Sequence, residues 1–214
     1  GTGREEWRSA SVRAILKNEK YMGDALLQKT YTSDFLTKKV KKNHGEVEQF
    51  YVKESHEAII PKEQWEAAQL ELERRDSYMQ ELGLTFYGYG SEVNPWKSRG
   101  VEFWQCNNRS KNHGVKGCAS ENLPHENLLK GFITAWNQIV AKREQYLPKW
   151  EKNKKDGNPL ERLRAEQMIG LTLQPPLTKM LPELGQMVLE RVIVQGKEIM
   201  VIRFLDGTEI KVRI

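Results

Sequence analysis

A helical pattern of apolar residues lies near the start of the chain. Three apolar side chains follow one another at the i, i+3 and i+4 spacing of a helix, namely Val12, Ile15 and Leu16. This spacing predicts a helix with one buried face, and Trp7 is expected to anchor that face in the core. Ser9 or Ser11 is placed to cap the first turn, and Tyr21-Met22-Gly23 is expected to end the helix.

Two strands and a second helix are predicted next. Residues 25–29 favour a short strand, and residues 47–53 favour a partner strand across a lysine-rich turn. The following helix is expected to begin at Pro61, because proline suits a first helical position, and to end at Arg74-Arg75. Its apolar stripe consists of Trp65, Ala68 and Leu72. A capped helix followed by a basic hairpin is typical of a winged-helix module.

The rest of the chain alternates between weak and strong patterns. Residues 76–84 show no pattern and predict a linker, and residues 149–158 predict a charged connector. From His125 onward, a broad helical face is formed by Leu128, Leu129, Phe132, Ile133, Trp136, Ile139 and Val140. Pro159 is expected to begin another short helix. Residues 192–194, 199–204 and 210–212 predict a three-stranded meander, with one turn at Asp206-Gly207.

Composition excludes two broad classes of protein. The mean hydropathy is −0.69 and 29% of the 214 residues are charged. No apolar run approaches the ~20 residues that a membrane helix needs, so we expect a cytoplasmic protein. The two cysteines, Cys106 and Cys118, are too few for a disulfide scaffold.

Positive charge is concentrated in the first part of the chain. Residues 1–45 contain ten Lys and Arg against five Asp and Glu, whereas residues 46–75 contain four against eight. On the first predicted helix, Arg13 and Lys17 lie one turn apart beside the small residues Ala10 and Ala14. Such a helix suits the major groove of DNA, where cations reach phosphates and guanine edges.

A run of four lysines has two interpretations. Lys38, Lys39, Lys41 and Lys42 surround one valine and precede Asn43-His44-Gly45, which is a turn signal. One interpretation is a solvated edge strand that resists aggregation. The other is a hairpin that contacts DNA.

Two segments carry a resemblance to a known family. Residues 7–23, WRSASVRAILKNEKYMG, and residues 56–61, HEAIIP, resemble the recombinase domain of large serine recombinases, which excise and insert transposons and phages. In that family the nucleophilic serine lies in a separate N-terminal domain, and this chain begins after the point where that domain would end. We therefore expect no catalytic residue, and we interpret His56 as a structural residue. The resemblance implies that DNA is contacted by Arg8, Ser9, Ser11, Arg13, Lys17, Lys38, Lys39, Lys41 and Lys42.

Residues 86–118 resemble the zinc ribbon of the same family, with one departure. The first cysteine pair of that ribbon is replaced by Phe86 and Tyr89, and a structural zinc needs four ligands. In one interpretation zinc is lost and the aromatic pair packs in its place. In the other, Cys106, Cys118 and His113 bind zinc, with His125 as a further candidate. We favour the first, and so expect no cofactor. Trp104 is expected in the core of this module. The cations Lys97, Arg99, Arg109 and Lys111 are candidates for contacting the outer part of a DNA site.

These observations predict an α+β chain of several modules. A winged-helix-like recombinase domain is expected at residues 1–76 and a zinc-ribbon-like β domain at residues 77–125. A helical insertion is expected at 126–185, and a β meander at 186–214 that completes the ribbon. The predicted function is sequence-specific binding of double-stranded DNA, as the part of a site-specific recombinase that targets its attachment site. The alternative is a degenerate stand-alone relative that docks other recombinase subunits.

Overall fold

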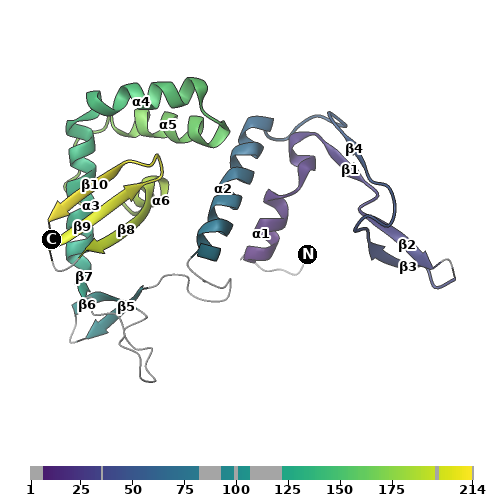
Figure 1. Ribbon diagram of the computed structural model, residues 1–214, viewed down its shortest axis with the longest axis horizontal. Helices are drawn as coiled ribbons and strands as arrows, with labels where there is room; N and C mark the ends of the chain where they lie inside the picture. The colour runs from purple at the N-terminus through teal and green to yellow at the C-terminus, as the bar shows by residue number, and fades with distance from the viewer. Residues whose placement is uncertain are drawn as a thin grey trace. The chain divides into compact units, whose positions relative to one another are not determined.

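A computed structural model describes residues 7–34, 36–81, 93–98, 101–106, 122–195 and 198–213 of the chain (Figure 1). The chain divides into two compact units, Gly1–Arg74 and Arg75–Ile214. Both combine helices with antiparallel strand pairs, which confirms the predicted α+β class. No described helix is both long enough and apolar enough to cross a membrane.

The first unit places a hairpin inside a strand pair. In chain order its elements are α1 (Ser9–Leu16), the 3-10 helix η1 (Glu19–Met22), β1 (Ala25–Leu27), β2 (Thr30–Asp34), β3 (Lys39–Lys42), β4 (Phe50–Val52) and most of α2 (Lys62–Glu81). β1 pairs with β4, as predicted for residues 25–29 and 47–53. Between them, β2 pairs with β3 as a separate two-stranded sheet. Lys39, Lys41 and Lys42 therefore lie on β3 and Lys38 in the turn before it, so the prediction of the lysine run as the turn between β1 and β4 is wrong.

Gly23 joins the two segments that resemble the recombinase family. It ends η1 with φ of +94°, and a Cβ at this position would lie only 2.8 Å from the carbonyl oxygen of His56. The His56 amide donates to the Gly23 carbonyl at 3.2 Å, and the amides of Ile59 and Ile60 both donate to the Tyr21 carbonyl at 3.0 Å. Only glycine satisfies both the positive φ and the close approach.

Asp24 ties the strand pair to the segment after it. Its carboxylate accepts hydrogen bonds from the Tyr51 hydroxyl at 2.7 Å and from the Glu54 amide at 2.9 Å. The hydrogen bond from Tyr51, followed by the one from Glu54, lowers the pKa of Asp24. The same hydrogen bond to Asp24 raises the pKa of Tyr51 to about 12. Both groups therefore keep their charge states across neutral pH.

Several expectations for α1 are wrong. The helix ends at Leu16, and Tyr21-Met22-Gly23 belongs to the separate helix η1 and its cap. None of its residues is buried, and Trp7 is 72% exposed, so neither a buried face nor a tryptophan anchor is formed. The N-cap residue is Arg8, and its side chain makes no capping hydrogen bond. Ser9 and Ser11 are already inside the helix, where a hydroxyl does not face the unpaired amides of the first turn. The apolar spacing indicated the helix correctly, but not how deeply it packs.

The second unit contains two separate three-stranded sheets. Its elements after the end of α2 are β5 (Val93–Ser98), β6 (Val101–Cys106), β7 (Leu123–Pro124), α3 (His125–Ala141), α4 (Arg143–Asp156), α5 (Pro159–Leu171), α6 (Pro182–Val188), β8 (Leu189–Gln195), β9 (Ile199–Phe204) and β10 (Glu209–Arg213). One sheet has the order β5-β6-β7, and the other has the order β10-β9-β8. The predicted meander is confirmed. Among the described strands it forms its own sheet, separate from β5-β6-β7. That it completes the ribbon-like domain stays a prediction.

The core of this unit lies between α3 and the meander, which are adjacent in Figure 1. Phe132 and Trp136 of α3 are almost fully buried, and the centroid of each ring lies 6.1 Å from that of Phe204 on β9. The predicted apolar face of this helix is thus confirmed. Trp104 of β6 packs against the same core, as expected, and donates through Nε1 to Nδ1 of His125 at 3.0 Å.

Two predicted loops are helical instead. α2 continues to Glu81, so most of the expected linker at residues 76–84 is helix. The expected connector at residues 149–158 lies mainly within α4, whose buried residue is Trp150. A helix anchored by one aromatic side chain shows little periodicity, which explains why it was missed. The predicted helix start at Pro159 is confirmed, because Asn158 and Glu161 form a capping box before it.

Candidate nucleic-acid interface

The four lysines project from a narrow antiparallel hairpin. We call β2, β3 and the turn between them the lysine hairpin. Lys41 pairs with Tyr31, and Lys42 pairs with Thr30. Side chains alternate between the two faces of a strand, so Lys39 and Lys41 lie on one face and Lys42 on the other. All four lysines are exposed. Among the described residues, no ion pair involves any of them.

Asn43 fixes the base of the lysine hairpin. Its side-chain amide is buried and donates to the carbonyl oxygens of Gln28 at 2.8 Å and Val47 at 2.6 Å. Its Oδ1 accepts from the amides of Gly45 at 2.9 Å and Val47 at 3.2 Å. The predicted turn at Asn43-His44-Gly45 is therefore confirmed. The sequence signal did not show that one asparagine would join this turn to the end of β1.

The candidate residues on α1 differ in accessibility. Arg8, Ser9, Ser11 and Lys17 are exposed, whereas Arg13 is half-buried and interacts within the protein. Arg8 flanks the helix start, and Lys17 follows its last residue as the C-cap. The structure thus brings Lys17 to the end of α1 that faces η1 and β1. Arg13 is the candidate least available to an external ligand.

An open groove of about 520 Å³ runs along the end of α1, and three lysines line it. Its wall is formed by Ala14, Lys17, Asn18, Lys20, Leu26, Leu27, Gln28 and Lys29. Lys29 approaches Glu19 with Nζ–Oε distances of 2.7 and 2.8 Å. Burial would raise the pKa of Glu19, but hydrogen bonds from Lys29 and Leu26 lower it overall. Sequence reasoning missed Lys20 and Lys29, because they belong to no charge run.

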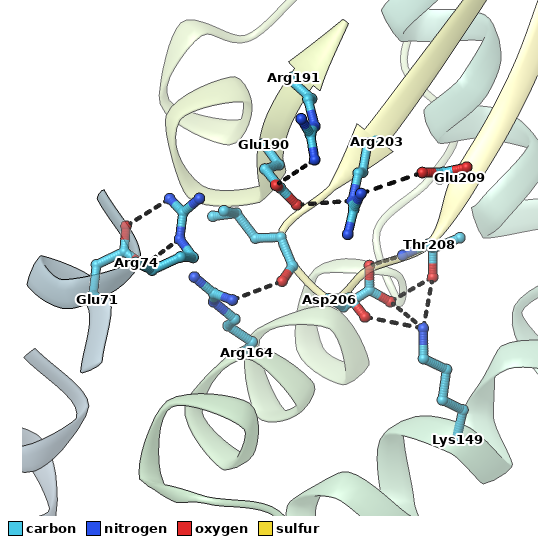
Figure 2. Close-up of polar contacts among 11 residues, drawn as sticks. Glu71, Arg74, Lys149, Arg164, Glu190, Arg191, Arg203, Asp206, Thr208 and Glu209 are labelled. Carbon is cyan, nitrogen blue, oxygen red and sulfur yellow. Dashed lines mark hydrogen bonds and ion pairs between the residues drawn. The ribbon is translucent and has the colours of Figure 1, made fainter. Parts of the chain in front are cut away.

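In the second unit, unlike in the lysine hairpin, several cations lie beside carboxylates, as Figure 2 shows. Glu190 is 3.1 Å from Nε of Arg203 and 3.6 Å from Nη2 of Arg191. Asp206 accepts from the Trp150 indole at 2.8 Å and lies 3.7 Å from Lys149 Nζ. These cations neutralise carboxylates within the fold. Arg191, Arg203 and Lys149 are thus paired with carboxylates of their own unit.

Several candidate residues fall outside the described residues. Phe86, Tyr89, Arg99, Arg109, Lys111, His113 and Cys118 do so entirely. Lys97 lies on β5 and Cys106 ends β6, but only their backbone is described. Nδ1 of His125 already accepts the Trp104 indole N–H. Within the part of the chain that is described, no group of three or more His, Cys, Asp or Glu residues could hold a metal ion. The two interpretations of the zinc ribbon both stay predictions.

Comparison with known proteins finds a family match in the first unit. Residues 1–75 match the family model described as Recombinase. This part of the chain is similar to a recombinase domain. The matched residues include the lysine hairpin, the α1 candidates and the Gly23 junction. No curated protein matches the chain. A solved structure, "Crystal Structure of a LSR-DNA Complex", is 14% identical, with a TM-score of 0.42, and the alignment covers 95% of this chain and 76% of that one.

Proposed function

We propose that the recombinase domain binds double-stranded DNA and that the chain is the DNA-targeting part of a site-specific serine recombinase. The family match supports recombination as the setting. The lysine hairpin is the observation that carries the proposal. Four exposed lysines on a ribbon two strands wide suit the phosphate backbone, because each lysine–phosphate contact releases condensed counterions.

α1 suits a second role, in the major groove. The major groove is about 12 Å wide and admits an α-helix, whose diameter with side chains is about 10–12 Å. Ser9 and Ser11 are exposed near its start and Lys17 near its end. We propose that these side chains contact base edges while the lysine hairpin holds the backbone. Attachment-site specificity would arise from α1, with an outer contribution from Lys97, Arg99, Arg109 and Lys111.

One observation favours a second function. Trp7, next to α1, is 72% exposed. Large aromatic residues are enriched at protein interfaces. We infer that this surface could dock another recombinase subunit. Trp7→Ala would then reduce self-association of the chain in sedimentation velocity and leave DNA affinity unchanged. Unchanged self-association would reject the docking role.

The proposed function is tested by removing positive charge from the lysine hairpin alone. Lys39, Lys41 and Lys42 are changed together to Gln, and binding to a labelled random-sequence duplex is measured by fluorescence anisotropy at low salt. We expect affinity to fall by roughly tenfold or more. The matched control changes the exposed Lys142, Lys152 and Lys155, at the start of α4 and within it, to Gln, which removes the same charge. Equal losses in both variants would mean that only net charge matters, and would refute a role for the hairpin.

A further inference from the structure

The tip of the lysine hairpin carries an apolar residue. Leu36 lies in the turn between β2 and β3 and is 87% exposed, more than any other large apolar residue among those described. Single exposed apolar residues are common and need no function. Here the exposure occurs at the end of a basic ribbon, so the tip combines apolar and cationic character.

Hydrogen bonds brace the described residues of the turn that presents Leu36. The carboxylate of Asp34 accepts the Leu36 amide at 3.0 Å and the hydroxyl of Thr37. These two hydrogen bonds, the one from Thr37 being the larger cause, lower the pKa of Asp34 and keep it ionised near neutral pH. The Ser33 hydroxyl donates to the Lys39 carbonyl at 3.1 Å across the ribbon. A braced turn loses little conformational entropy when it binds a partner.

The neighbours of Leu36 determine which partner fits. Lys38 follows it in the same turn, with φ of +50°, and Lys39 begins β3. Non-glycine residues rarely adopt such a φ, and strained positions concentrate at binding sites. An apolar protein surface would disfavour two adjacent ammonium groups. DNA is a polyanion whose stacked base pairs form an apolar interior. It therefore accommodates both the ammonium groups and the leucine side chain.

We propose that Leu36 is a wedge that enters the minor groove and partly unstacks one base-pair step of the bound DNA. This inference rests on the proposed DNA binding. Apolar wedges of this kind kink the duplex at the step they enter, and pyrimidine–purine steps unstack most easily. Leu36 would thus add sequence preference through DNA deformability, without a hydrogen bond to any base.

The test uses DNA that the protein itself selects. Wild-type chain selects duplexes from a random-sequence library, and one selected duplex is resynthesised with the fluorescent analogue 2-aminopurine at each adenine in turn. Unstacking increases the fluorescence of 2-aminopurine. We expect wild type to increase it at one step, Leu36→Ala to abolish that increase with a roughly tenfold loss of affinity, and Leu36→Met to retain it. Leu173→Ala is the matched control, because Leu173 is 69% exposed in the second unit.

The outcomes separate the wedge from DNA binding itself. If wild type binds none of the library duplexes, the proposed function fails and the wedge fails with it. If it binds them all equally, the wedge alone fails, because no deformable step is preferred. If Leu36→Ala binds the selected duplex like wild type and gives the same fluorescence increase, the wedge is overturned while DNA binding stands. A third outcome is that wild type increases 2-aminopurine fluorescence at no step although Leu36→Ala binds more weakly. In that case Leu36 contacts the DNA surface without unstacking it. That result also overturns the wedge.

Discussion

Gly23→Ala tests the backbone junction between the two ends of the first unit. The substitution adds a methyl group where φ is +94° and where the His56 carbonyl oxygen would lie 2.8 Å away. A positive φ costs an alanine about 1–2 kcal/mol. Relieving the overlap requires a shift of backbone, since the nearest atom is not a side chain, and overpacking of this kind costs roughly 1–3 kcal/mol. We therefore expect a destabilisation of about 2–5 kcal/mol.

Gly45→Ala in the same unit separates these two contributions. Gly45 has φ of +116°, and a Cβ there would meet no atom within 4 Å. Its substitution should cost only the conformational part, about 1–2 kcal/mol. Amide hydrogen exchange at His56, Ile59 and Ile60 is the suitable assay, because it reports the opening of the first unit without averaging over the second. Equal destabilisation by the two substitutions would refute the close approach at Gly23.

Three further predictions concern a side-chain anchor, pH and metal. Asn43→Ala should destabilise the base of the lysine hairpin by about 1–3 kcal/mol, visible as faster exchange of the Val47 amide, because all four hydrogen bonds of the buried Asn43 side chain are lost. Since its hydrogen bonds lower the pKa of Asp24 below the usual 3.8, this group stabilises the fold above pH 3.8, and that contribution is lost as pH falls through the lowered pKa. Tyr51→Phe should therefore make stability less sensitive to acid in a pH series of urea denaturation; an unchanged acid dependence would contradict this. Elemental analysis should find well under one equivalent of zinc; stoichiometric zinc lost together with folding on chelation would instead indicate Cys106, Cys118 and a histidine as ligands.

The sequence predicted elements with strong local signals. The helix start at Pro159 and the Asp206-Gly207 turn follow from residues that act on their own backbone. Gly207, with φ of +80°, and the capping box at Asn158 illustrate this. Spacing of apolar residues likewise located α1 and α3. These elements can be predicted without knowledge of distant contacts.

The sequence did not predict features that depend on tertiary context. The exposure of Trp7 depends on how α1 packs, which periodicity does not report. The separate pairing of β2 with β3 depends on the buried side chain of Asn43, which closes the hairpin against residues on both sides. α4 is anchored by Trp150 through the core and through Asp206, more than 50 residues away. Lys20 and Lys29 become neighbours in the groove only when η1 and β1 are formed.

The salt dependence of DNA binding is the most direct test of the central claim, that the lysine hairpin contacts the phosphate backbone. The affinity of the full chain for a random-sequence duplex is measured across a salt series, for wild type and for the triple change of Lys39, Lys41 and Lys42 to Gln. Each lysine–phosphate contact contributes about 0.9 to the slope of log affinity against log salt, so the variant should be shallower by about 2.7. A slope equal to that of wild type would contradict the account.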